Sequence, residues 1–490
     1  MGAFKLFLFN KFNILILFLG IVFLSISVYK ASHTAFTHDE SFTYLSYVKK
    51  SVIGIVRMEE PVSANNHILN SLSMKVIDKL MPPTPFNLRL PNIFGHLLFL
   101  FFSALFVNNF KNNYFKVFGF VLLNANIYLI DIFSLARGYG LSLGFLMMHW
   151  YFLSNTLRNR DNKNNVRLML FALFLAMLSS FSIIYYALSI ILIYIIFEIK
   201  NGIQNNNNFL SLITNNLKTF AVFAILSAGF LFEPMLKLIN FKQLYFGGTN
   251  NFFDDTIYSL VFYSSNAVNL SDDQINFIYV LTLLLLASTT IIQTFRLLKN
   301  GTTIYSGLFI SLFVMIMIIQ IAFFYLFNTK YLIQRTALFL TPLFVIALLG
   351  VLDELGYTLI YFFSGFVAIF LFYITLRYTP LTKSLNWGYD ADNESLISDL
   401  KSIHNKSNNK EKLSLGVDWI FQPSLNYYRA TTEAGLWLDT IIKEGYDNKK
   451  FEYFFVESQS LSKFVDTNQF KVLKTYHQSN NSLIKNLKFE

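Results

Sequence analysis

Two adjacent carboxylates, Asp39 and Glu40, are the residues of this sequence best suited to acid–base chemistry. They stand in the run Thr37-His38-Asp39-Glu40-Ser41, directly after the first long apolar stretch. A carboxylate within hydrogen-bond reach of a hydroxyl can take its proton and accelerate its attack by about 10²–10⁴-fold. Asp39 is the candidate base. For Glu40 three roles stay open: orienting an acceptor, assisting a divalent cation, or capping the next helix, where acidic residues are common.

Basic residues that suit an anionic partner occur in two later segments. Arg137 stands in the run Ala136-Arg137-Gly138-Tyr139, and Lys330 and Arg335 lie close together further along the chain. Such cations can hold phosphate oxygens through charge-assisted hydrogen bonds, and the planar fork of arginine suits this better than lysine. Arg137, Arg335 or Lys330 could therefore hold an anionic group. Tyr139 is a further candidate ligand there, with packing as its alternative.

His67 and Arg89 are candidates for binding or positioning an acceptor. Arg89 can equally be a residue whose charged end reaches out of an apolar region. Glu40, Glu59, Glu60 and His67 also supply donor types that a divalent cation such as Mg²⁺ or Mn²⁺ accepts. Their spacing is not diagnostic of a metal site, and solvation at the surface is the alternative. The sequence therefore predicts no cofactor with certainty and leaves a divalent cation open.

These residues must be positioned by a membrane-embedded scaffold. Of the 490 residues, 54% are hydrophobic and only 14% charged, which excludes a soluble protein. A membrane span needs about 20 mostly apolar residues, and about eleven such runs are present. They lie at roughly 12–30, 88–107, 115–133, 139–155, 167–181, 183–199, 218–239, 275–294, 303–327, 336–352 and 357–376. The sequence therefore predicts an all-α polytopic membrane protein.

Charge in the short loops predicts its orientation. Lys and Arg accumulate in cytoplasmic loops, and here they cluster in alternate loops, whereas the loop near 240–273 is acidic. The pattern fits a cytoplasmic N-terminus and an extracytoplasmic C-terminus in the inner (cytoplasmic) membrane. Asp39, Arg137 and Arg335 then share the outer face. Because charges at membrane depth are costly, we expect them to line one cavity.

Two segments lie outside the predicted spans. Residues 32–87 form an outer loop within a membrane domain of residues 1–383, with a predicted interfacial helix over 41–58 and a second helix over 68–80 that ends before Pro82. Residues 384–490 predict a small extracytoplasmic α/β domain. Its expected elements are helices near 394–405 and 422–431 and strands near 412–418, 451–457 and 470–475.

Several partner classes are excluded or disfavoured. No Gly-rich phosphate loop of the Rossmann or Walker type is present, so a nucleotide-linked donor has no visible site. The net charge of +10 comes largely from short loops, without a basic patch interleaved with aromatic residues, so no nucleic-acid partner is expected. Cysteine is absent, which removes thiolate chemistry altogether.

The order of these short motifs resembles the GT-C glycosyltransferases, especially the protein O-mannosyltransferase and aminoarabinose-transferase type and their bacterial relatives. The matching motifs are Asp39-Glu40, Asn66-His67-Ile68-Leu69, Leu88-Arg89-Leu90-Pro91 and Arg137 followed by Tyr139. His67-Ile68-Leu69 departs from the family's frequent His-Pro-Pro. The resemblance implies a polyprenyl-phosphate-linked sugar as donor, a protein, lipid or glycan acceptor at the outer face, and inversion by direct displacement.

Other functions would use a similar chain. A transporter or flippase for a lipid-linked or small solute also has many spans and buried charges, but its charges should lie at mid-membrane depth in paired halves. A polymerase or ligase of lipid-linked glycans would share the donor, although its large outer loop usually comes later. A purely structural scaffold gives no reason for Asp39-Glu40 beside an interfacial helix. The transferase is therefore the favoured hypothesis, with the transporter second.

Overall fold

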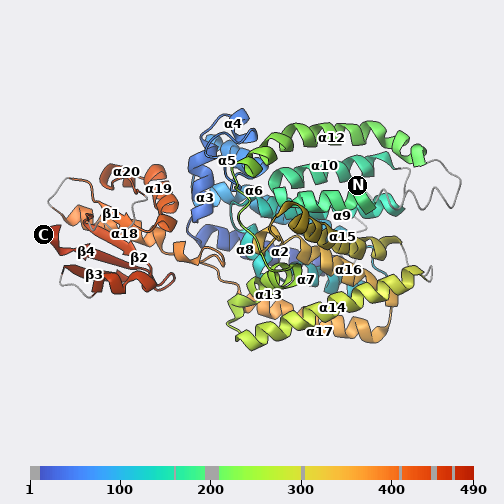
Figure 1. Cartoon of the computed structure of the whole chain (residues 1–490). Helices are drawn as coiled ribbons and strands as arrows, with labels where there is room; N and C mark the ends of the chain where they lie inside the picture. Colours follow the sequence, from blue (N-terminus) through green and yellow to red (C-terminus); the bar gives the residue numbers. More distant parts are fainter. Residues whose placement is uncertain are drawn as a thin grey trace.

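The computed structural model describes residues 11–489 except 159–161, 194–208, 299–303, 408–410, 443–449 and 466–468. Within this part, six helices are long and apolar enough to cross a membrane. They are α2 (Lys11–His33), α6 (Pro85–Val107), α12 (Phe209–Asn240), α14 (Asp272–Leu298), α15 (Ile304–Phe327) and α17 (Thr358–Tyr378). Together with the shorter helices they form one bundle (Figure 1). The predicted polytopic all-α architecture is thus confirmed.

The remaining predicted spans are shorter, bent or less apolar helices. The run 115–133 is the pair α7 (Asn113–Asn124) and α8 (Ile127–Phe133), bent by 63° where Asn126 caps α8. α9 (Gly138–Arg158), α10 (Lys163–Ser179), a helix over Phe181–Ile193 and α16 (Leu340–Leu355) complete the bundle. The predicted span at 183–199 runs on into residues outside the described part.

Glycines bring α9 close to its neighbours and so place its first residue beside the outer loop. A Cβ at Gly144 would lie 2.3 Å from the carbonyl oxygen of Gly95 on α6. At Gly138 a Cβ would lie 2.0 Å from the Ser179 carbonyl oxygen at the end of α10. Real Cβ atoms do not approach backbone this closely, so only glycine permits the packing. Arg137, directly before α9, is thereby fixed at this end of the bundle.

The loop between α2 and α6 folds into short helices over the same end. They are α3 (His38–Thr43), a π-helical turn at Tyr44–Val48, α4 (Val52–Val56) and α5 (Ile68–Leu80). The predicted helix over 68–80 is confirmed. The prediction of a single helix over 41–58 is wrong. The helical turn ends at Val48, and a new helix begins after Ser51, whose hydroxyl accepts from Gly54 N at 2.9 Å.

The C-terminal part is a small α/β domain beside this end of the bundle (Figure 1). Its sheet has the order β1-β2-β4-β3, in which β1 pairs parallel to β2 and the other pairs are antiparallel. The elements are α18 (Asn393–Lys406), β1 (Leu415–Val417), α19 (Gln422–Thr431), α20 (Ala434–Trp437), β2 (Tyr453–Val456), β3 (Phe470–Thr475) and β4 (Ser482–Asn486). All predicted elements are present, and neither α20 nor β4 was predicted.

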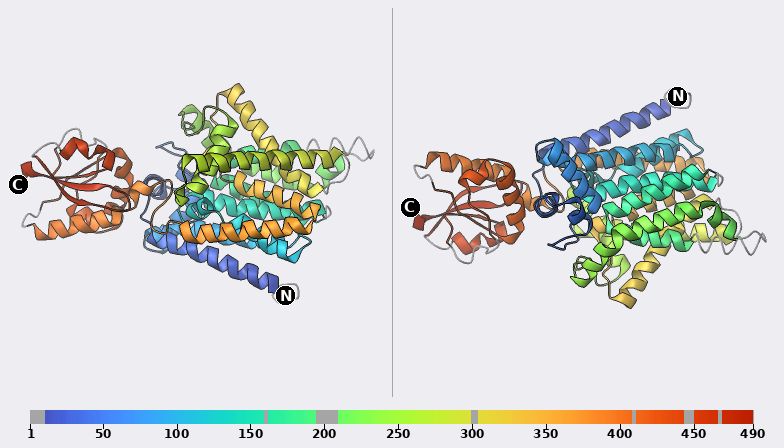
Figure 2. Two further views of the ribbon diagram at one scale, coloured as in Figure 1. Left: turned by 90° about the horizontal axis from the view of Figure 1, so that it is seen from below. Right: turned by 90° about the horizontal axis from the view of Figure 1, so that it is seen from above.

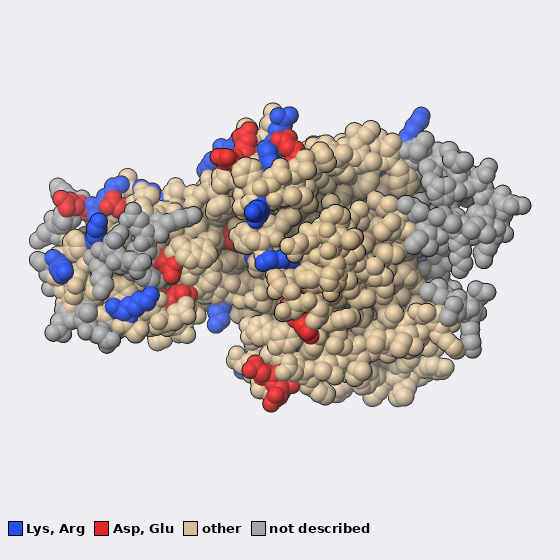
Figure 3. Space-filling view, in the orientation of Figure 1, with Lys and Arg blue, Asp and Glu red and all other residues tan. Residues whose placement is uncertain are grey.

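The ends of the described chain lie on opposite sides of the bundle (Figure 2). Charged side chains gather over the short helices and on the C-terminal domain, while the rest of the bundle surface seen in this view shows mostly uncharged residues (Figure 3). We call the end of the bundle next to the C-terminal domain the site end. An apolar belt with a charged cap is what a membrane-spanning domain requires.

Candidate functional site

The start of α3 turns the two adjacent carboxylates in different directions. Thr37 is the N-cap residue, and its backbone N–H and hydroxyl both donate to Glu40 Oε2 at 2.9 Å. This capping box fixes the first helical turn. Because successive residues of a helix are about 100° apart around its axis, Asp39 then faces a different part of the molecule from Glu40.

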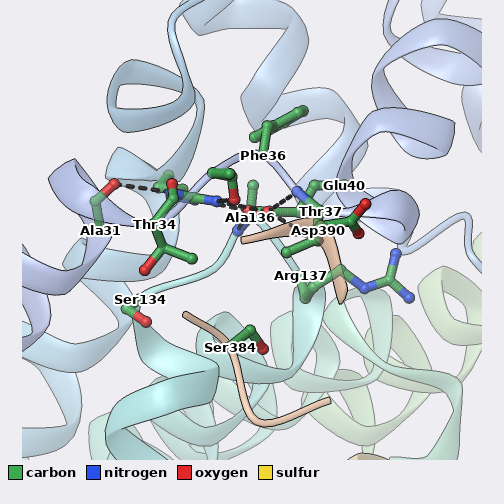
Figure 4. Close-up of polar contacts among 12 residues, drawn as sticks. Ala31, Thr34, Phe36, Thr37, Glu40, Ser134, Ala136, Arg137, Ser384 and Asp390 are labelled. Atoms are coloured by element: carbon green, nitrogen blue, oxygen red, sulfur yellow. Dashed lines mark hydrogen bonds and ion pairs between the residues drawn. The ribbon is translucent and has the colours of Figure 1, made fainter. Parts of the chain in front are cut away.

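Glu40, which Figure 4 shows close to Thr37 and Ala136, forms a buried ion pair with Arg89 of α6. Arg89 Nε and Nη2 donate to the carboxylate at 2.8 and 2.7 Å, and both side chains are fully buried. The other guanidinium N–H groups donate to backbone carbonyls at the end of α2, those of Ala31, Thr34 and Ala35. The backbone N–H of Ala136 also donates to Glu40.

This arrangement places Glu40 and Arg89 as anchors of the scaffold. All five N–H groups of Arg89 have acceptors, and both oxygens of Glu40 have more than one donor. Neither side chain has a free polar atom for a substrate. Capping, one of the roles left open for Glu40, is confirmed. Its catalytic role, and the acceptor-binding role of Arg89, stay predictions that this geometry does not support.

Asp39 instead faces two arginines from distant parts of the chain. Its Oδ2 lies 3.3 Å from Arg137 Nη2 and 3.7 Å from Arg335 Nη2. Asn65 Nδ2 donates to Oδ1 at 3.2 Å. Within the described residues Oδ2 accepts no hydrogen bond, although it is buried. The structure thus brings Asp39, Arg137 and Arg335 together, as expected, while their lining of a common cavity stays a prediction.

The charge state of Asp39 follows from these neighbours. Burial by itself raises the pKa of its carboxyl, but the guanidinium groups of Arg137 and, more weakly, Arg335 outweigh burial and hold the pKa below its usual value. Asp39 is therefore ionised at neutral pH. A buried carboxylate with an open lone pair and two cations beside it has the equipment for both proton transfer and anion binding.

Arg137 is held rigidly. Its Nη1 donates to the Asp39 carbonyl at 3.3 Å and to Thr43 Oγ1 at 3.2 Å, and its Nη2 donates to Asn65 Oδ1 at 3.0 Å. Asn65 therefore connects Asp39 and Arg137, because it donates to Asp39 and accepts from Arg137. Asn65 was not among the candidate residues predicted from the sequence.

Arg335 is held mainly by aromatic faces. It lies in a 3₁₀ turn at Gln334–Thr336, and its guanidinium carbon is 4.2 Å from the ring centroid of Phe246 and 4.9 Å from that of Trp387. Arg137 lies 5.8 Å from the Tyr139 ring and 5.9 Å from the same Trp387 ring. Contacts of this kind stabilise a cation by roughly 0.5–2 kcal/mol. Phe246 and Trp387 were both missed, because nothing in their local sequence distinguishes them from packing residues.

His67 supports the site from behind. Its ring stands edge-on to Tyr139 at 4.6 Å and is almost completely buried. Burial lowers the pKa of His67 well below its ordinary value, so the imidazole is neutral. The contact with Tyr139 fits a packing role, and acceptor binding by His67 remains a prediction.

Two further predicted groups lie away from Asp39. Lys330 is exposed and packs beside Gly247, and no ion pair joins it to Asp39 within the described chain. Glu59 and Glu60 are also exposed. No group of three or more His, Asp or Glu residues with metal-site geometry occurs in the described ranges. Since Glu40 is saturated and cations already flank Asp39, these residues do not fit a divalent metal, and no step below uses one.

The helical bundle, the short helices over one end and the small C-terminal domain define a polytopic membrane protein. Solved structures with this fold include ArnT from Cupriavidus metallidurans in the apo state, at a TM-score of 0.53 and 10% identity, covering 96% of this chain and 97% of that one. The same protein bound to undecaprenyl phosphate has a TM-score of 0.50 and 11% identity over the same shares. No family profile and no curated protein sequence matches the chain.

Proposed function

We propose that this protein is an integral membrane glycosyltransferase. It transfers a sugar from a polyprenyl-phosphate donor to a hydroxyl of a protein, lipid or glycan on the extracytoplasmic side, with inversion. The observation that carries the proposal is Asp39 Oδ2, which is buried, accepts no hydrogen bond from the described residues and lies 3.3 and 3.7 Å from two arginines. The ArnT-like fold supports it, since ArnT has been crystallised with undecaprenyl phosphate.

The geometry suits a single displacement. The acceptor oxygen forms a bond to the anomeric carbon while the bond from that carbon to the phosphate oxygen breaks, and Asp39 Oδ2 takes the hydroxyl proton. The leaving lipid phosphate gains negative charge, which Arg137 and Arg335 stabilise by charge-assisted hydrogen bonds. Attack from the side opposite the phosphate inverts the anomeric centre.

Because Asp39 and the donor phosphate would both pair with Arg137 and Arg335, binding of the donor changes the basicity of Asp39. Without the donor, Arg137 and Arg335 pair with Asp39 and depress the pKa of its carboxyl. A phosphate that draws their N–H groups away weakens this effect, so the pKa of Asp39 rises and the carboxylate becomes a stronger base. Asp39 thus becomes most basic when a donor is present.

An apolar cavity of about 1030 Å³ suits a polyprenyl tail. It is lined by α7, α8, α13 (Tyr258–Ser265), α14, α16 and α17. On α13, Ser259 Oγ accepts from the backbone N–H of Gln334, the residue before Arg335, at 2.9 Å. The tail would then lie among these helices with its phosphate directed towards Arg335.

The orientation is part of the proposal. Charged residues cap the site end, and the described N-terminal end lies on the opposite side of the bundle (Figures 2 and 3). With the N-terminus in the cytoplasm, as the loop charges indicate, the site faces outwards. A flippase or transporter, the alternative, would need its polar groups near the middle of the membrane.

The test is release of free polyprenyl phosphate from a panel of polyprenyl-phosphate sugars by the purified protein. We expect release with at least one sugar, and we expect Asp39→Asn to abolish it without loss of donor binding. Asp78→Asn is the matched control, because Asp78 lies in the same loop but pairs with Lys49 at 2.8 Å. Normal turnover by Asp39→Asn would remove Asp39 as the base. No release with any sugar, together with vesicle transport of one, would favour the alternative.

A further inference from the structure

The segment that joins α17 to α18 contacts both arginines of the site and the residue before Asp39. Residues 379–392, here called the connecting segment, link the bundle to the C-terminal domain. A linker between domains is usually exposed and makes few contacts. This one crosses the site end of the bundle and carries the buried residues Ser384, Trp387 and Asp390.

A buried ion pair holds the first half of the connecting segment. Lys30 of α2 and Asp131 of α8 are 3.0 Å apart and both fully buried. Lys30 Nζ also donates to the carbonyls of Pro380 and Lys383. Asp131 Oδ2 accepts from Ser384 Oγ at 3.1 Å and from Leu385 N at 3.2 Å. Both charges therefore use their remaining hydrogen-bonding capacity to fix the backbone of this segment.

The second half of the connecting segment is hydrogen-bonded to residues next to Arg335 and Asp39. Asn386 Nδ2 donates to Oε1 of Gln334, next to Arg335, at 3.2 Å. The His38 backbone N–H, next to Asp39, donates to Asp390 Oδ2 at 2.7 Å. Gln334 has a left-handed backbone, with φ of 51°, which costs energy in a residue other than glycine and has to be held by such contacts.

Trp387 lies between these two attachments, and its ring meets both arginines. The guanidinium carbon of Arg335 is 4.9 Å from the ring centroid and that of Arg137 is 5.9 Å away. Trp387 is 4% exposed. Two like charges that converge on one carboxylate repel each other, and an aromatic face beside both offsets part of that repulsion while restricting their rotamers.

We propose that Trp387, positioned by the connecting segment, is a positioning residue of the donor-phosphate site that orients Arg137 and Arg335 towards the lipid phosphate. This inference rests on the proposed function. It gives Trp387, which lies outside the membrane bundle in the connecting segment, a role in the site formed by the bundle. The energy involved is that of two cation–π contacts, so loss of the aromatic face should weaken phosphate binding by about tenfold.

The test compares Trp387→Phe, which keeps an aromatic face, with Trp387→Leu, which keeps apolar bulk without one. The probe is undecaprenyl phosphate without sugar, titrated into full-length protein in nanodiscs. We expect Trp387→Phe to stay within about threefold of the original affinity and Trp387→Leu to lose about tenfold, with equal melting temperatures. In turnover, Trp387→Leu should raise the donor KM more than it lowers kcat.

Fluorescence gives a second readout if Trp387→Leu does not fold. Undecaprenyl phosphate should change the tryptophan emission of the original protein, and Trp387→Phe should abolish that change. Trp150→Phe is the control, because Trp150 is buried on α9 outside the site and should keep the change. Equal affinities of the Phe and Leu variants, or an unchanged fluorescence response in Trp387→Phe, would overturn the proposal. Absence of any phosphate binding by the original protein would instead overturn the proposed function.

Discussion

The residues of the site divide into two charged sets with different chemistry, although sequence places them side by side. Glu40 and Arg89 satisfy each other completely, while Asp39 keeps an oxygen without a hydrogen bond beside Arg137 and Arg335. A buried pair without spare donors or acceptors stabilises a fold, and a partly satisfied carboxylate is available to a ligand. Position in the motif cannot reveal this difference, because it depends on partners far along the chain.

The arginines should set the pH dependence of the reaction. Asp39 works as a base only when ionised, so activity falls as the pH drops through the pKa of its carboxyl. Arg335→Ala removes one cation that depresses this pKa, and we expect the acidic limb of kcat/KM for the donor, normalised to its own maximum, to move to higher pH. Lys330→Ala, which removes an exposed cation not paired with Asp39, should leave the limb in place. If the acidic limb of the pH profile were the same in Arg335→Ala and the original protein, Arg335 would have no effect on the pKa of Asp39.

At the scale of elements, the Glu40–Arg89 pair is the joint of α2, α3 and α6. Glu40→Gln leaves the Arg89 guanidinium buried without its counter-charge, which typically costs about 3–5 kcal/mol. We expect a clear loss of thermal stability and of monodisperse protein, whereas Asp39→Asn should melt close to the original protein. Melting curves in one detergent test this. A Glu40→Gln protein that is stable but inactive would show that Glu40 has a catalytic role.

Elements with local signals were predictable, and those defined by distant contacts were not. α5 was predicted over Ile68–Leu80 with its end set by the prolines that follow, and a helix was also predicted at α19, Gln422–Thr431. β4 was missed because its short run has no boundary signal and is defined by pairing with both β2 and β3. Trp387 was missed for the same reason, since only the folded connecting segment brings it to the arginines.

At the scale of the whole molecule, the C-terminal domain is fastened to the segment that carries Asp39. Tyr428 Oη accepts from Phe36 N at 2.7 Å, and the Tyr427 ring lies 4.1 Å from that of Phe36. Asp390 adds the contact to His38, and its carboxylate also accepts from Asn393 and Ser424 at 2.8 Å. Three contacts within a few residues of Asp39 mean that the position of the domain and the geometry of the base are linked.

Asp390 should make this attachment depend on pH. Burial raises the pKa of its carboxyl to about 7, despite the donors around it. Between its ordinary pKa of about 4 and 7 the folded protein therefore binds more protons than the unfolded chain, so stability decreases as the pH rises through this range and levels off above it. We expect the melting temperature to fall from pH 5 to pH 8 and to fall less in Asp390→Asn, which cannot ionise. An equal fall in both proteins would show that Asp390 does not take up the proton, and that the domain is held equally well at either pH.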